Sequence, residues 1–473
     1  MAKINAKTFN LKSLTLAHNQ IGIIISTLVL MIFITGTFSV FRPELNNLQW
    51  QLSEVDGAPN EKSPGLNGPE LLAHIKQAQL VDIADNDSDD GAQVKIIYPD
   101  DRAFYYRLVV KYQGNEEHYT FAASDGRLLA NSDRQSFADL VFALHTHLLL
   151  PAGKFVVGLA GLLLLFVLQS GLIIHFRQIK RQLFKFRPQK DKDKWLDLHK
   201  LFGLVALPFS YTVTLTGVIF NLLLIFQVAF VMLIYQGDIK SLLSDAGYYQ
   251  VETSEPIFEK KPVVQVLDIE ALEALVADKS LKSLTINNYG LSNAYVQLDK
   301  RTEAFAPSHY DIYALSPLDS SGQLIYSSAD KVNAMSFGVE VMKLLHVGHY
   351  GGTATQVLYF LLGLCCCLLV YAGMRLWLNR QYQGLNKQSQ WPMLKPKVLA
   401  LIDGVFVLSG TGLMACLSIG TFVLLIGLGP WLNAYVVDWP IVLMLFVLVV
   451  VLVVVLVRRW ICSPSVGGPS WRE

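Results

Sequence analysis

Charged side chains are scarce in this 473-residue sequence. They make up 16% of the residues, whereas hydrophobic residues make up 52%. Soluble globular proteins are about 25% charged, so this deficit excludes an ordinary soluble domain and predicts a membrane protein. The formal net charge of +1 gives no support to nucleic-acid binding, and we expect no nucleic-acid partner.

Cysteine is also rare, and its placement excludes a disulfide framework. Three of the five cysteines are consecutive, at 365–367, and the other two are Cys416 and Cys462. Consecutive residues on a helix point in different directions and do not hold one metal ion together, so we interpret these cysteines as packing residues. The Walker A, GxSxG and HExxH patterns are missing as well, which leaves hydrolysis and ATP-driven transport without support.

Six apolar runs are long enough to cross a bilayer, which requires roughly 20 helical residues. Continuous apolarity favours helices over barrel strands, because barrel strands alternate and are shorter. We expect the first run to be retained as a helix, since it lacks a clear small-x-small cleavage site. The six expected spans are about 21–41, 155–174, 201–235, 344–374, 405–432 and 440–457.

Acidic residues are few in the segments that we place on the cytoplasmic side. Residues 176–200 hold nine Lys and Arg against three Asp, and residues 375–397 hold five basic residues and no acid. By contrast, residues 42–139 carry nine basic and seventeen acidic groups, and residues 236–340 carry eight and fifteen. The positive-inside rule therefore predicts two large outer segments and two cytoplasmic termini.

The two outer segments share one pattern, a helical stretch followed by runs that alternate like strands. Each is long enough for a small domain, and neither contains a cysteine. We expect two separate α+β domains, each a helix packed on a small antiparallel sheet. The helices are expected at 69–80 and 269–281, and the strands at 92–98, 103–112, 116–123, 283–289, 293–300 and 309–315.

The chain is thus expected to be an α-helical polytopic membrane protein with six transmembrane helices and two outer domains. Its parts are a first helix (1–41), an outer domain (42–139), a second helix (140–178), a basic linker (179–196), a third helix (197–235), a second outer domain (236–335), a fourth helix (336–378), a linker (379–396), a fifth helix (397–432), and a sixth helix with a tail (433–473).

The membrane unit occurs twice. LAHNQIGIIISTLVLMIFITG (16–36) and DLHKLFGLVALPFSYTVTLTG (197–217) match at an offset of 181 residues. Their shared positions are a histidine, a glycine four residues later and the glycine of a Thr-Gly pair, namely His18, Gly22 and Gly36, then His199, Gly203 and Gly217. Such fixed spacing indicates an internal repeat. Because both copies begin on the same side, they are expected to be parallel repeats about an axis along the membrane normal.

Each copy also carries a second histidine before its next apolar run. SFADLVFALH ends at His145, and SFGVEVMKLLH ends at His346. An ionisable residue within a membrane is by default a functional-site hypothesis. Four histidines in two matched pairs suggest ligands of a planar metal cofactor, with His18 opposite His199 and His145 opposite His346. Pairing within one copy stays open. Zinc is less favoured, since the two pairs are expected at opposite ends of the membrane and do not form one tetrahedral set.

The order of these motifs resembles the PepSY-associated transmembrane proteins. The resemblance covers about residues 10–380 and includes the duplicated helix–PepSY–helix order, the Thr-Gly pairs and LHTHLLLPAGKFVVG (144–158). It implies a bacterial inner-membrane protein with two periplasmic PepSY-like domains, similar to iron-regulated haem proteins that reduce ferric siderophores. Some relatives carry a cytoplasmic flavin-binding reductase domain, which we do not expect in the sequence up to Glu473.

The resemblance also implies haem b, with two groups held by the four histidines through bis-His ligation. Electrons would come from quinol or a cytoplasmic flavin reductase and pass to a periplasmic acceptor, foremost a ferric siderophore, with membrane lipid as the other partner. His147 and His349 are alternative ligands. His175 is expected to be a ligand, a propionate partner or an interfacial residue, and Arg42 and Arg177 to be propionate partners or interfacial anchors.

Two other functions remain open at this point. The PepSY-like domains would bind a peptide or a protease, with the spans as anchors or signalling elements and the histidines replaceable. Alternatively, the chain would be a haem subunit that serves another redox enzyme and has no substrate site of its own.

Overall fold

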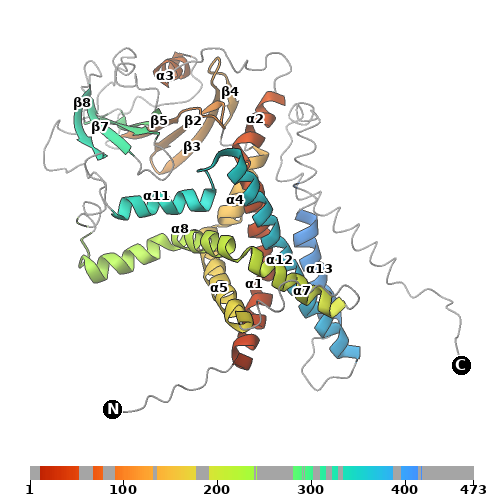
Figure 1. Cartoon of the computed structure of the whole chain (residues 1–473). Coiled ribbons are helices and arrows are strands. Elements are labelled where there is room, and N and C mark those ends of the chain that lie inside the picture. Colours follow the sequence, from red (N-terminus) through yellow and green to blue (C-terminus); the bar gives the residue numbers. More distant parts are fainter. Residues whose placement is uncertain are drawn as a thin grey trace, which may run out of the picture. The chain divides into compact units, whose positions relative to one another are not determined.

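The chain folds as two compact units, and Figure 1 labels many of their helices and strands. The first unit draws on residues 1–40, 141–222 and 357–473, and the second on residues 41–140 and 223–356. The computed structural model describes residues 11–52, 68–77, 91–131, 136–176, 191–238, 241, 281–289, 291, 293–301, 309–315, 322–328, 334–386, 396–413 and 417.

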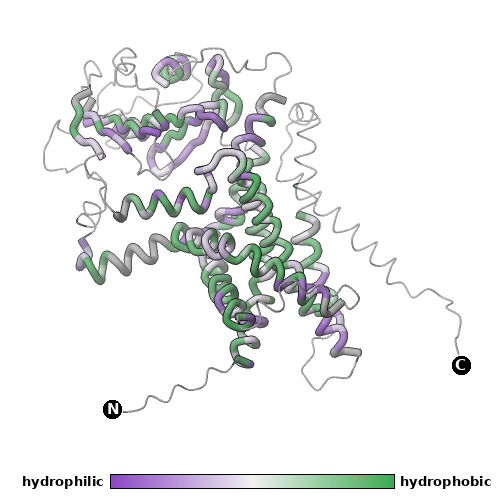
Figure 2. Tube along the Cα trace, in the orientation of Figure 1, coloured by the Kyte–Doolittle hydropathy of each residue, from purple (hydrophilic) through white to green (hydrophobic). Residues whose placement is uncertain are grey.

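The first unit is helical, and three of its helices are long and apolar enough to cross a membrane. They are α1 (Leu11–Ser39), α5 (Gly153–His175) and α12 (Gly352–Asn386). Two further helices, α7 (Asp191–Val205) and α8 (Leu207–Ile234), form a bent pair. If this pair counts as one span, the described residues contain up to four spans. Figure 2 shows hydrophobic residues along most of these helices, as expected for segments surrounded by lipid.

The sixth predicted span and most of the fifth lie outside the described residues. The described start of the fifth consists of α13 (Pro396–Val407) and a short π-helix, η3 (Leu408–Gly412).

The apolar run predicted as the fourth span does not start where the sequence indicated. A separate helix, α11 (Ala334–Val347), precedes α12. The break contains Gly348 and Gly352, whose φ angles are +77° and +60°. These left-handed conformations favour glycine and end a helix, so the span begins at Gly352 rather than near Leu344. A separate helix also precedes α5. This helix, α4 (Phe137–His147), ends at His147, and a turn at 148–152 separates it from α5.

The third apolar run is also interrupted. Its two halves, α7 and α8, meet at Ala206 with a bend of 66°. Pro208 explains the break, because its ring clashes with the carbonyl four residues earlier and it has no N–H to donate. In the first copy the equivalent position, 181 residues earlier, is Thr27, and α1 continues through it without a break.

The second unit contains one eight-stranded antiparallel sheet in the order β4-β3-β2-β1-β5-β6-β7-β8. The two sets of strands expected in separate sheets are joined here through β1 and β5, where Val94 is opposite Ile286 and Ile96 is opposite Leu284. The strands are β1 (Ala92–Ile97), β2 (Tyr105–Tyr112), β3 (Asn115–Ala122), β4 (Leu128–Ala130), β5 (Leu281–Tyr289), β6 (Tyr295–Lys300), β7 (His309–Leu315) and β8 (Gly322–Ser327).

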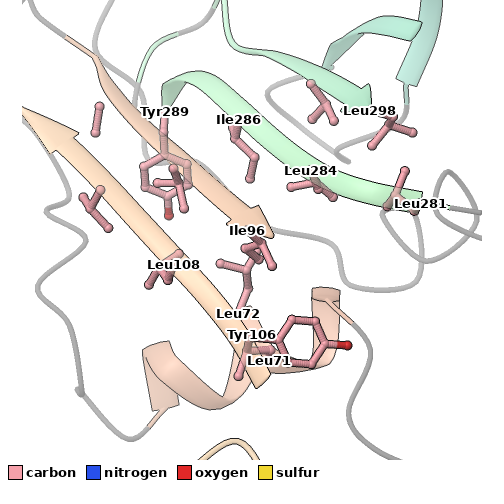
Figure 3. Close-up of a cluster of buried hydrophobic side chains, with 14 of the residues drawn as sticks. Leu71, Leu72, Ile96, Tyr106, Leu108, Leu281, Leu284, Ile286, Tyr289 and Leu298 are labelled. Carbon is pink, nitrogen blue, oxygen red and sulfur yellow. The ribbon is translucent and has the colours of Figure 1, made fainter. Parts of the chain in front are cut away.

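A hydrophobic core crosses the junction between the two strand sets. Leu71 and Leu72, from helix α3 (Gly68–Gln77), are fully buried with side chains of β1, β2, β5 and β6 (Figure 3). Because one core holds both sets, the sheet behaves as a single packing unit. The helix predicted at 269–281 lies outside the described residues except for Leu281, which begins β5.

Candidate cofactor site in the helical unit

A cavity of about 290 Å³ opens among the helices of the first unit. Its walls are mainly apolar side chains of α1, α5, α7 and α12. Three histidines and four glycines also line it, namely His18, His175, His199, Gly22, Gly171, Gly203 and Gly373. An apolar chamber with a few convergent polar groups is typical of a small-molecule or cofactor site.

His18 of α1 and His199 of α7 face each other across this site. Their ring centres are 6.4 Å apart, and the ring planes are inclined by 76°. Two imidazole nitrogens that each lie about 2 Å from a shared metal ion place the ring centres about 6 Å apart, since a ring centre lies about 1 Å behind its nitrogen. The separation of the two ring centres therefore fits a pair of imidazoles that would bind one metal ion.

Hydrogen bonds fix which nitrogen of each ring carries the proton. The Nδ1 atom of His18 lies 3.1 Å from the carbonyl oxygen of Val167, and that of His199 lies 3.0 Å from the carbonyl oxygen of Leu369. A carbonyl only accepts, so both Nδ1 atoms donate. Nε2 is then left with the lone pair, as required for a metal ligand whose other nitrogen is held by the protein.

One glycine of the cavity leaves room for a flat group. A Cβ atom added at Gly22 would meet no atom within 4 Å, although the residue lines the cavity. Gly22 is one turn beyond His18, so the two share a helix face. The two Nε2 atoms, the open face at Gly22 and the apolar walls together fit a planar metal cofactor that His18 and His199 would hold.

His145, on α4, is held in the same way at another point of the helical unit. Its Nδ1 atom donates to the carbonyl oxygen of Ile32 at 2.9 Å, and its ring lies against Gly36 of α1. His147 is the last residue of α4. The proposed partner, His346, is on α11 in the second unit, and His349 follows it in the turn before α12.

The cavity contains positive residues that the sequence reasoning missed. Lys200 and Arg380 line it together with His175. Lys200 is next to His199 in the sequence. Arg380 is seven residues, or about two helical turns, beyond Gly373 and so lies on the same helix face. These two spacings could have indicated that both residues belong to the site. Arg42, by contrast, donates to Asp139 at 2.6 Å within the second unit, and Arg177 lies outside the described residues.

The fold and the site define a helical membrane protein with an antiparallel sheet domain and paired histidines. Residues 15–380 match the PepSY-associated TM region. The match spans more than half of the sequence, so the chain belongs to the PepSY-associated TM family, as the motifs predicted. A search of curated proteins found no match.

Proposed function

We propose that this protein is a six-span haem protein that carries electrons across the bacterial inner membrane to a periplasmic acceptor, foremost a ferric siderophore. The observation that supports this most strongly is the facing pair His18 and His199, with ring centres 6.4 Å apart and both Nδ1 atoms engaged by backbone carbonyls. Family membership agrees with a membrane protein of this architecture.

In this proposal the inner site binds one haem b through the Nε2 atoms of His18 and His199. The bound haem supplies a one-electron redox couple. The surrounding apolar side chains keep water away, and Lys200 and Arg380 offer positive charge to the two propionates. His18 and His199 would together hold the iron, so the site would serve electron transfer rather than substrate binding.

The sequence repeat extends the proposal to a second haem. His145 and His346 occupy equivalent places in the two copies of the sequence, so on the sequence repeat alone these two histidines would hold a second, outer haem. From His18 to Gly36 a helix rises roughly 27 Å. A second redox centre shortens that path. Both termini would be cytoplasmic and the sheet unit periplasmic, consistent with the distribution of Lys and Arg.

The acceptor reaction balances with one electron for each iron. The donor, a quinol or a cytoplasmic flavin reductase, is oxidised, and the ferric chelate becomes ferrous. The siderophore holds ferrous ion more weakly, so iron is released. The resemblance to ferric-siderophore reductases, rather than a residue of this chain, supports this last step.

The direct test is a reduced-minus-oxidised absorption spectrum of the detergent-purified protein, with haem quantified per chain. We expect low-spin cytochrome bands and about two haems per chain, and we expect ferric siderophore to reoxidise the reduced protein. Absence of haem in protein made under haem-replete conditions would overturn the redox proposal and favour peptide or protease binding. A reduced haem that ferric siderophore does not reoxidise would instead indicate a subunit that serves another redox enzyme.

The cationic lining leads to a separate prediction. Arg380→Gln removes a positive charge at the cavity, so we expect haem affinity to fall about 10- to 100-fold, the usual effect of losing a charge-assisted hydrogen bond. The band positions should persist, because the axial ligands are intact. Haem titration of the depleted protein measures the effect, with Arg107→Gln on β2 as the control. Equal affinity in the two variants would exclude Arg380 as a propionate partner.

A further inference from the structure

One arrangement occurs three times in the helical unit. In each case a histidine Nδ1 atom donates to a backbone carbonyl of a facing helix, and a glycine occupies the position four residues beyond that carbonyl. The three sets are His18 with Val167 and Gly171, His199 with Leu369 and Gly373, and His145 with Ile32 and Gly36. The glycines therefore share a role in how these imidazoles are held.

Helix geometry explains the spacing. The carbonyl of residue i points toward residue i+4, and the side chain of residue i+4 tilts back over that turn. Any side chain there covers the carbonyl oxygen on its outer side. Glycine leaves the oxygen exposed, so a second donor from a neighbouring helix reaches it beside the N–H of the helix itself.

The contact distances show how tightly each ring fits. A Cβ atom added at Gly36 would lie 2.6 Å from Cε1 of His145, and one at Gly373 would lie 2.9 Å from Cε1 of His199. At Gly171 the nearest atom, Cε1 of His18, would be 3.2 Å away. Alanine at the first two positions therefore forces the imidazole to move, whereas alanine at Gly171 needs only a small adjustment.

The two inner contacts differ in one detail. The hydroxyl of Ser170 lies 2.9 Å from Nδ1 of His18 and donates to the carbonyl of Val167, so it accepts from the ring as well. The equivalent position in the second copy, 202 residues later, is Ala372. His18 thus has two acceptors for its Nδ1 proton, and His199 has one described acceptor.

We propose that Gly36, Gly171 and Gly373 are positioning residues that open a backbone carbonyl for each imidazole, and that Ser170 makes the two ligands of the inner haem unequal. This inference rests on the proposed haem function. An acceptor at Nδ1 increases the basicity of a ligating imidazole and stabilises the oxidised metal. A weakened Nδ1 contact therefore raises the midpoint potential of the haem concerned.

Redox titration of the purified full-length protein, combined with its low-spin EPR signal, tests the assignment. We expect Gly373→Ala to raise the potential of one haem and shift its EPR signal, and Gly36→Ala to do so for the other haem. Gly171→Ala should give a smaller shift in the first haem. Gly338→Ala on α11 is the matched control, because its added Cβ meets no atom within 4 Å.

A reciprocal pair of variants tests the role of Ser170. Ser170→Ala removes one acceptor and should raise the potential of the inner haem, while Ala372→Ser adds the missing hydroxyl and should lower it. Haem retained with unchanged potentials and EPR signals in Gly373→Ala and Ser170→Ala would overturn the inference. If Gly373→Ala fails to fold, the milder Gly171→Ala and Ser170→Ala decide the question. Absence of haem from the unaltered protein would instead contradict the proposed function.

Discussion

His18→Ala is expected to remove one haem per chain, reducing the content from about two to about one. His199→Ala should give the same loss. The reason is the geometry of the pair: the two ring centres are 6.4 Å apart, and each Nδ1 is held by a backbone carbonyl, which leaves Nε2 as the ligand atom. The backbone carbonyls and apolar side chains around the two rings do not provide a ligand for haem iron as strong as the imidazole that is removed. Haem quantification and the reduced spectrum of each purified variant measure the loss.

The control for these variants is His118→Ala, on β3 of the sheet unit, which should keep the full haem content. The double variant His18→Ala/His199→Ala is expected to lose no more haem than either single variant, since both ligands serve one site. Two separate losses that add together would show that the two histidines belong to different haems, and the proposed pairing would be wrong. A low-spin haem retained in His18→Ala would point to His175, which lines the same cavity, as a substitute ligand, whereas a high-spin haem would show that only His199 still binds the iron.

Gly22→Leu is the second change with a large expected effect. A side chain at this position meets no protein atom within 4 Å of its Cβ and extends from a residue that lines the cavity. The leucine therefore fills space that the planar cofactor requires, and we expect the inner haem to be absent while the protein still folds. Haem content, together with the thermal unfolding of the detergent-solubilised protein, distinguishes blocked binding from unfolding.

Gly338→Leu is the matched control, because it adds the same side chain to a helix position with open space and lies outside the cavity. It should keep both haems. Full haem content in Gly22→Leu would mean that no cofactor lies against this face of α1. The cavity would then need another occupant, although the proposed roles of His145 and His346 would be unaffected.

Much of the local structure follows from hydrophobic periodicity. The strand expected at 309–315 is β7 with the same bounds, and the run expected at 155–174 is α5, extended by a residue or two at each end. These elements are predictable because alternation and continuous apolarity each specify one way of burying side chains. The helix breaks before α5 and α12 were missed because the turns are short and directly adjoin long apolar runs, although Pro151, Gly348 and Gly352 are residue types that commonly end a helix.

The candidate site was predictable only in part. The repeat identified His18 and His199 as a pair, and the structure places both in the lining of one cavity with ring centres 6.4 Å apart, while their role as ligands stays a prediction. Lys200 and Arg380 escaped notice, because a basic residue beside a membrane span is commonly only an interfacial anchor. Nothing in the sequence indicated which backbone carbonyls hold the imidazoles, because every residue has a backbone carbonyl.

The sequence by itself determined the membrane class, the family and the positions of many of the described helices and strands. These properties depend on composition and on short-range periodicity, both of which can be measured directly from the sequence. Only the tertiary structure decided that β1 and β5 join two strand sets in one sheet, and that glycines on facing helices open the carbonyls used by His18, His145 and His199. Such features depend on which distant segments pack together. Packing between distant segments produces no local sequence pattern, so the sequence alone does not predict it.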